Sequence, residues 1–212
     1  MNHRVIRPAQ VRAAPDLTGL GLDAAIIASA ITFTHETLDA LDATLIQRGQ
    51  PRMSEMIELA NLSAMIGNVF RSGVERASNG GFQSNAPHTY PDLLGVGDGC
   101  VSVEIKVALE TNQPKGHLVK PGPHLIVRYV LGGTDGAFDR DARGDVVWIW
   151  EVRVGMLLAT HFNSSNTAGD SGKTAVINAA GMAALAPVHF DVERCPYGER
   201  SKHRRGLIAL FP

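Results

Sequence analysis

The segment CVSVEIKVAL, residues 100–109, has the alternating pattern of a β-strand with one buried face. Because successive side chains of a strand point to opposite faces, the alternation places Glu104 and Lys106 on the same face, about 7 Å apart, together with Ser102. The opposite face is apolar and consists of Val101, Val103, Ile105 and Val107. The segment therefore predicts a strand, at about residues 101–107, that carries two charged groups on one face.

A short segment at residues 90–96 runs into the turn sequence GVGDG, residues 95–99, and predicts a hairpin with the strand at 101–107. Such a hairpin brings Asp92 beside Glu104. Two carboxylates held together repel each other unless a cation or a proton lies between them. Mg²⁺ is typically held by one or two protein carboxylates together with waters and phosphate oxygens, so the pair predicts a Mg²⁺ site. The ammonium of Lys106 would lie close enough to hold an attacking water and to offset charge that develops on a phosphate.

The rest of the chain has helical spacing first and strand patterns later. Helices are expected at about residues 22–47, with a possible break at the β-branched stretch 31–34, and at about residues 53–77. Strands are expected at 124–131, 146–154, 187–192 and 206–211, and an Ala-rich helix at about 174–185, capped by Asp170 or Ser171. In the strand at 146–154, Trp148 and Trp150 are expected on one face, in the core or a subunit interface. The valines expected on the same face are Val146, Val152 and Val154. This order predicts a mixed α/β (α+β) domain with a central mixed sheet of about five strands flanked by helices.

Composition narrows the class of protein. The 212 residues suit one domain, and 20 Lys and Arg against 21 Asp and Glu give a net charge of −1, which excludes a protein that is basic overall. No apolar run approaches the roughly 18 residues of a transmembrane helix, so no membrane partner is expected. Two cysteines and an N-terminal segment without an apolar core fit a soluble, cytoplasmic protein.

Pro91-Asp92, eleven intervening residues and then Glu104-Ile105-Lys106 in an apolar strand resemble the signature of the PD-(D/E)xK nucleases, the superfamily that includes most type II restriction endonucleases. The resemblance covers about residues 53–154 and implies a restriction-endonuclease-like core. It implies that Asp92 and Glu104 are Mg²⁺ ligands and that Lys106 orients or activates the water that hydrolyses a DNA phosphodiester. It further implies a homodimer and products with 5′-phosphates.

Many members of this superfamily add a carboxylate from the preceding helix. Glu58 and Glu75 both fall on the polar side of the helix expected at 53–77, about 25 Å apart at 1.5 Å per residue, so at most one can reach the metal. The separation usual in the family favours Glu58. Both acids could equally be solvated surface groups.

Three segments are candidates for contacts with DNA, although each could also be an ordinary solvated segment. They are the Gly- and Pro-containing loop at 113–123, the polar loop at 163–174 and the basic stretch at 194–205. The sequence GDSGKT at 169–174 lacks the first glycine and the leading strand of a nucleotide-binding loop. The candidate DNA-binding residues are Lys115, Lys120, Asn163, Ser165, Asn166, Lys173, Arg194, Arg200, Lys202, Arg204 and Arg205.

These observations lead to the expectation of a Mg²⁺-dependent type II restriction endonuclease that cuts double-stranded DNA as a homodimer. The chain would divide into a helical part at about 1–80, a catalytic sheet at about 88–154 and a DNA-recognition part at about 155–212. Two alternatives remain open: a repair or recombination nuclease of the junction-resolvase type, and a noncatalytic DNA-binding module on a nuclease scaffold.

Overall fold

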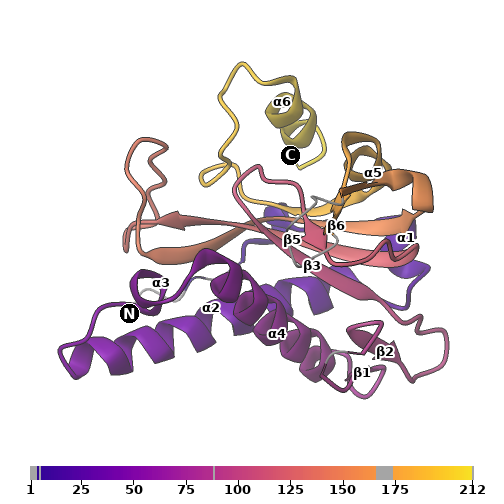
Figure 1. The fold of residues 1–212 in the computed structure, drawn as a ribbon, viewed down its shortest axis with the longest axis horizontal. Coiled ribbons are helices and arrows are strands. Elements are labelled where there is room, and N and C mark those ends of the chain that lie inside the picture. Colours follow the sequence, from indigo (N-terminus) through magenta and orange to yellow (C-terminus); the bar gives the residue numbers. More distant parts are fainter. Residues whose placement is uncertain (1–3, 5, 88, 166–173, 212) are drawn as a thin grey trace.

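A central sheet separates two layers in the computed structural model, which describes residues 4, 6–87, 89–165 and 174–211 (Figure 1). The sheet is mixed, because β3 runs parallel to β5 whereas β5–β6 and β6–β9 are antiparallel. The predicted mixed sheet between helices is confirmed, but the sheet has four strands and not about five. In spatial order they are β3 (Glu104–Leu109), β5 (Gly122–Gly132), β6 (Val146–Leu157) and β9 (Ala186–Phe190).

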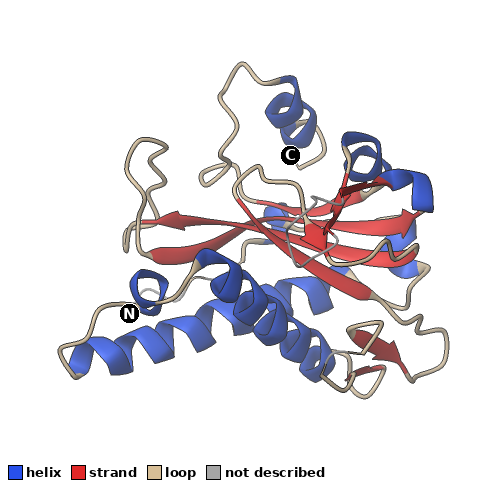
Figure 2. Ribbon diagram, viewed as in Figure 1, coloured by secondary structure: helices blue, strands red, loops and turns tan. Residues whose placement is uncertain are grey.

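The two faces of the sheet are covered differently (Figure 2). One face packs against α1 (Pro15–Thr18), α2 (Ala24–Gln47) and α4 (Leu59–Ala77). The other packs against α5 (Ala179–Ala184), α6 (Lys202–Ile208) and a small sheet in the order β4 (Lys115–Gly116), β8 (Thr174–Ile177) and β7 (Phe162–Ser165). The remaining elements are η1 (Pro8–Gln10), α3 (Met53–Met56), η2 (Ala159–His161) and the hairpin of β1 (Phe82–Ser84) and β2 (Leu93–Gly95).

A β-bulge in β6 separates the side chains that were expected to share one face. Arg128 of β5 pairs with Glu151 and the next residue, Tyr129, pairs with Ile149, so Trp150 is the extra residue. On the α6 side, Val146 packs with Trp148 and with the bulge residue Trp150. Beyond the bulge, Val152 and Val154 pack on the side of α2 and α4. The prediction that the tryptophans are core residues is confirmed, but their grouping with Val152 and Val154 is wrong.

The first helix has no break. Residues 31–34 lie within α2, where the Thr34 hydroxyl donates to the Ala30 carbonyl at 2.7 Å and both residues are buried. Packing therefore outweighs the weak helix propensity of β-branched residues. The helix expected at 53–77 is two helices, because Ile57 is extended (φ −117°, ψ 148°) between α3 and α4. Glu58 is consequently the N-cap residue of α4 and not a residue of its polar face.

Two predictions for the C-terminal part are wrong. Residues 174–177 form strand β8, which pairs with β7, and the helix that follows is only α5, capped by Asn178, whose side chain accepts from Gly181 N at 2.9 Å. The proposed caps Asp170 and Ser171 lie outside the described residues. No strand forms at 206–211; residues 206–208 are the end of α6, where Leu207 packs against the tryptophan cluster.

The hairpin expected between residues 90–96 and 101–107 is reduced to one bridge, between Leu93 and Val103. β2 pairs mainly with β1, and β3 begins at Glu104. Asp92 still reaches β3, because its side-chain carboxylate accepts a hydrogen bond from the backbone amide of Ile105. β3 is therefore an edge strand of the central sheet.

We predict that Gly73→Ala destabilises the fold. A Cβ atom at Gly73 would lie 2.9 Å from Ala30 Cα and 3.0 Å from its carbonyl oxygen, so α2 and α4 would have to separate. The expected loss in the free energy of unfolding is about 1–3 kcal/mol, measured by urea denaturation. Gly206→Ala is the control: a Cβ there meets nothing within 4 Å, and helix propensity should stabilise by up to about 1 kcal/mol.

We also predict that buried His35 makes stability depend on pH. Its Nε2 accepts from Ile149 N at 3.0 Å, and burial holds the pKa of His35 well below its usual value, so it stays neutral in the folded state. In the unfolded chain it gains a proton below about pH 6.5, so the free energy of unfolding falls with decreasing pH, by up to about 1.4 kcal/mol per unit for this residue.

In His35→Gln the amide oxygen can still accept from Ile149 but does not titrate. Urea denaturation between about pH 7 and pH 5 should therefore give a smaller loss of stability for this variant than for the wild type. Equal losses would show that His35 does not contribute.

Candidate active site

Asp92, Glu104 and Lys106 meet at the N-terminal end of β3. Asp92 directly precedes β2, and its Oδ2 accepts from Ile105 N at 2.8 Å, which fixes the carboxylate against the strand. The Lys106 ammonium donates to Glu104 Oε1 and lies 4.0 Å from Asp92 Oδ2. One ammonium thus lies between both carboxylates, so the structure brings together the three residues that the sequence singled out.

Glu104 is wholly buried, and two lysines compensate its charge. Oε1 accepts from Lys106 and also from Lys120 Nζ at 2.7 Å. Burial opposes ionisation, but the hydrogen bonds and charges of the two lysines outweigh it and hold the pKa of Glu104 below its ordinary value. Lys120 was predicted to contact DNA, and the structure places it within the site.

Asp92 has the opposite electrostatic environment. Burial raises the pKa of Asp92, and the negative charge of Glu104 adds to the increase, although the hydrogen bond from Ile105 acts against it. The two carboxylates therefore differ: Glu104 is firmly ionised, whereas Asp92 is the group whose charge a bound cation would most relieve.

Two residues that sequence analysis missed complete the surroundings. The ring centroid of Tyr90 lies 4.8 Å from Lys120 Nζ, and its hydroxyl donates to Pro121 O at 2.9 Å. His124 pairs with Glu104 across β3 and β5; its Nδ1 contacts Gly122 O at 2.9 Å, and burial lowers the pKa of His124. The imidazole is therefore neutral, with Nδ1–H donating. His124 lies beside Glu104 only because β3 and β5 pair in parallel, and no sequence motif predicts that pairing.

The site opens into a cleft of about 700 Å³ between α4 and the free edge of β3. Asp92 and Lys106 lie in its wall, and consecutive residues of β3 line its length. The segment that follows β3 forms another side and contributes Lys115, which begins β4 and is exposed. The cleft therefore presents Asp92 and Lys106 to whatever binds along β3.

The residues present suit Mg²⁺ in number and type. Glu104 Oε2 is buried and has no hydrogen-bond partner, an unusual state for a carboxylate oxygen that a cation could relieve. Within the described ranges there is no group of three or more His, Cys, Asp or Glu arranged to hold a metal. A cation here would thus have two carboxylates, with its other ligands from water or substrate, which is the coordination that Mg²⁺ accepts.

The helical carboxylates do not line the cleft. Glu58 is exposed at the start of α4 and is not among the cleft residues, whereas Glu75 accepts from the Ser84 hydroxyl at 2.6 Å. The polar residues that α4 presents to the cleft are Ser63, Asn68 and Arg71. Sequence analysis had considered only Glu58 and Glu75 of this helix as site residues.

The remaining candidates for DNA contact are dispersed. Asn163 and Ser165 lie on β7, where Asn163 Oδ1 accepts from Asn178 at 3.4 Å; Asn166 and Lys173 lie outside the described residues. Arg204 donates to Tyr197 O at 3.1 Å. The exposed members of the basic stretch, at the start of and within α6, are Arg200, Lys202 and Arg205.

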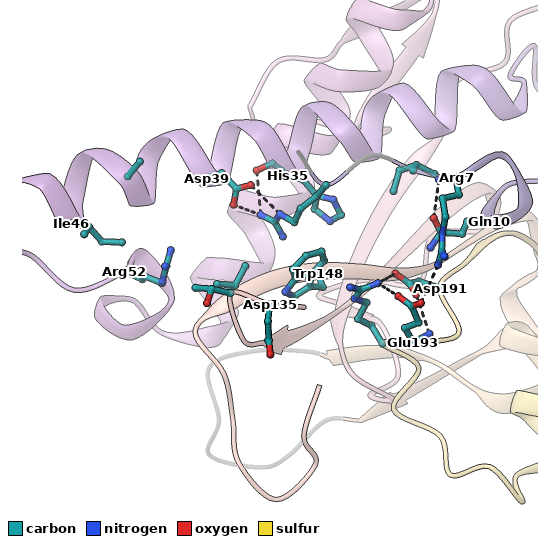
Figure 3. A pocket seen from close by; sticks show the side chains of 16 residues that line it. Arg7, Gln10, His35, Asp39, Ile46, Arg52, Asp135, Trp148, Asp191 and Glu193 are labelled. Atoms are coloured by element: carbon teal, nitrogen blue, oxygen red, sulfur yellow. Dashed lines mark hydrogen bonds and ion pairs between the residues drawn. The ribbon is translucent and has the colours of Figure 1, made fainter. Parts of the chain in front are cut away.

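Arg194 belongs to a second pocket, of about 490 Å³, at the other end of β6 (Figure 3). It forms ion pairs with Asp191 at 2.9 Å and Glu193 at 2.7 Å, and its guanidinium lies 4.4 Å from the Trp148 ring centroid. Gly155 is the residue of β6 that pairs with His124, which in turn pairs with Glu104. Trp148 precedes Gly155 by seven residues, or about 20 Å along the strand. Arg194 is thus engaged far from the candidate active site.

No protein-family model matches this chain, and no curated protein sequence matches it. In the described part of the chain, no helix combines the length and the apolar character required to cross a membrane.

We predict that Lys106 and Lys120 together stabilise buried Glu104. The double variant K106M/K120M leaves that carboxylate without a counter-charge, so the free energy of unfolding in urea should fall by about 3 kcal/mol. Adding Glu104→Gln should recover much of this loss because it removes the buried charge. The exposed Lys202→Met is the control and should change stability by no more than about 0.5 kcal/mol. A double variant as stable as wild type would contradict this account of Glu104.

Proposed function

We propose that this protein is a Mg²⁺-dependent endonuclease that hydrolyses phosphodiester bonds in double-stranded DNA. The observation that carries the proposal is the contact of Lys106 with both Asp92 and Glu104 at the edge of an open cleft. The motif similarity to PD-(D/E)xK nucleases supports the same chemistry. Asp92 and Glu104 would hold Mg²⁺, which when bound supplies a Lewis acid for a phosphoryl oxygen and acidifies a water.

The chain's own residues have distinct roles in this proposal. Lys106 reaches the cleft and can hold the attacking water or offset charge on the phosphate in the transition state. Lys120 does not line the cleft and keeps Glu104 ionised. Hydrolysis forms a bond between the water oxygen and phosphorus and breaks the bond between phosphorus and the 3′ oxygen. The 3′ oxygen takes a proton and leaves as a hydroxyl, and the phosphate stays on the 5′ end of the other product.

Sequence specificity of the restriction type and a two-fold homodimer complete the proposal. A symmetric dimer with one site per subunit would cut both strands of a palindromic sequence. The exposed basic residues of the C-terminal part are the candidates for contacts with the DNA backbone.

We predict that purified protein cuts plasmid DNA into discrete fragments when Mg²⁺ is present and that EDTA stops the reaction. Sequencing the fragment ends should return one short symmetric site. Cutting at branched DNA alone would instead indicate a junction resolvase, and binding without cutting would indicate a noncatalytic module. Cleavage that EDTA does not affect would contradict the role of Mg²⁺.

We further predict that Lys106→Ala lowers the cleavage rate at least about 100-fold while DNA affinity changes only a few-fold, because Lys106 acts on the reacting groups. Arg48→Ala, which changes an exposed cation at the C-cap of α2, is the matched control and should cut at the wild-type rate. A Lys106→Ala protein that cleaves normally would show that the lysine is not catalytic.

A further inference from the structure

Arg71 is the cationic side chain that α4 contributes to the cleft, across from β3. It lies on α4, faces the same space as Asp92 and Lys106, and is partly exposed. The motif that carries the proposed chemistry does not include it.

Arg71 has no anionic partner among the described residues, whereas five other buried or half-buried arginines each pair with a carboxylate. Its Nε–H is buried and donates to no acceptor of the protein, and Arg71 makes no hydrogen bond or ion pair with any residue that the structure describes. The contrasting pairs are Arg4–Asp39, Arg52–Asp42, Arg128–Glu151, Arg153–Glu151 and Arg194–Asp191. Burying part of a guanidinium without such a partner is unfavourable, so an anion in the cleft would relieve a cost that the protein alone leaves in place.

The charges around Arg71 point the same way. The charged residues of the cleft wall are three cations, Arg71, Lys106 and Lys115, and one carboxylate, Asp92. Glu104 does not line the cleft, and counting it together with Lys120 leaves four cations against two carboxylates. The cleft is therefore positive, and it remains positive beyond the immediate surroundings of Asp92.

The packing of α4 on β3 fixes where along the cleft Arg71 lies. Gly67 of α4 packs directly on β3, because a Cβ atom there would lie 3.1 Å from Val107 Cγ2. Arg71 is four residues, or about 6 Å, further toward the C-terminal end of α4. That end lies beside the β1–β2 hairpin, the element that Asp92 adjoins (Figure 1).

We infer that Arg71 binds a phosphate of the DNA strand that lies in this cleft along β3. The inference rests on the proposed function and adds to it a substrate-binding residue on α4. A guanidinium presents parallel N–H donors that match two phosphate oxygens, which an ammonium cannot do. With Lys106 at the reacting phosphate, Arg71 would hold the same strand from the helix side and fix its direction in the cleft.

The test compares Arg71→Ala and Arg71→Met with Arg76→Ala. Arg76 lies on the same helix, is exposed and packs over the Phe33 ring, with its Cζ 5.1 Å from the ring centroid, so it is a matched control outside the cleft. Fluorescence anisotropy with a labelled duplex of random sequence, in EDTA so that nothing is cut, gives the dissociation constant over a series of salt concentrations.

Loss of one bidentate phosphate contact should weaken binding about tenfold in both Arg71 variants and reduce the salt dependence by about one counterion. Arg76→Ala should change neither quantity. An unfolding midpoint of Arg71→Met close to that of the wild type keeps the comparison free of misfolding.

The inference is overturned if the Arg71 variants bind as tightly as wild type with the same salt dependence, if Arg76→Ala weakens binding equally, or if the wild type does not bind DNA. Binding of inorganic phosphate through Arg71, with DNA affinity unchanged in the variants, would overturn the assignment to DNA. A wild type that binds DNA through Arg71 but never cuts it would remove the proposed function and leave this inference standing.

Discussion

The parallel pairing of β3 with β5 is the constraint on which the site depends. Because the strands run in the same direction, the chain that leaves the end of β3 at Leu109 must return to the beginning of the sheet before β5 starts at Gly122. That return brings Lys120 and His124 to the same end of the sheet as Glu104. An antiparallel connection would have taken both residues to the far end of the strand. The buried carboxylate therefore has its counter-charges as a consequence of topology.

The same topology explains which parts of the site could be predicted from the sequence. Asp92, Glu104 and Lys106 are linked by a local pattern, a strand with its preceding turn, and local patterns are visible in a sequence. The role of Lys120 was not visible, because sixteen residues separate it from Glu104 and only the strand direction brings the two together. Arg71 lies on another element, and its position depends on how α4 packs against β3.

The fold was predictable to a similar extent. Mixed α/β character and most strand positions follow from periodicity, whereas the errors arose where tertiary contacts outweigh local preference. Residues 174–177 are β-branched in part and form strand β8, because β7 offers a pairing partner. Leu207 lies in helix α6, because the helix packs this side chain against the tryptophan cluster. The β-bulge at Trp150 is invisible in a run of apolar residues, since either parity fits such a run.

That bulge has a consequence for how far insertions and deletions can be tolerated in β6. The extra residue reverses the parity of the strand midway, so the aromatic half and the valine half each keep their own buried face. Removing the extra residue, Trp150, would make Ile149 and Glu151 sequence neighbours on opposite faces, which are the faces that they already have, so both halves would keep their buried faces and only the Trp150 side chain would be lost from the core. β6 also fixes β5 in register, and β5 fixes β3. The bulge therefore lets β6 carry one residue more than its partner strand while β5, β3 and Glu104 keep their positions.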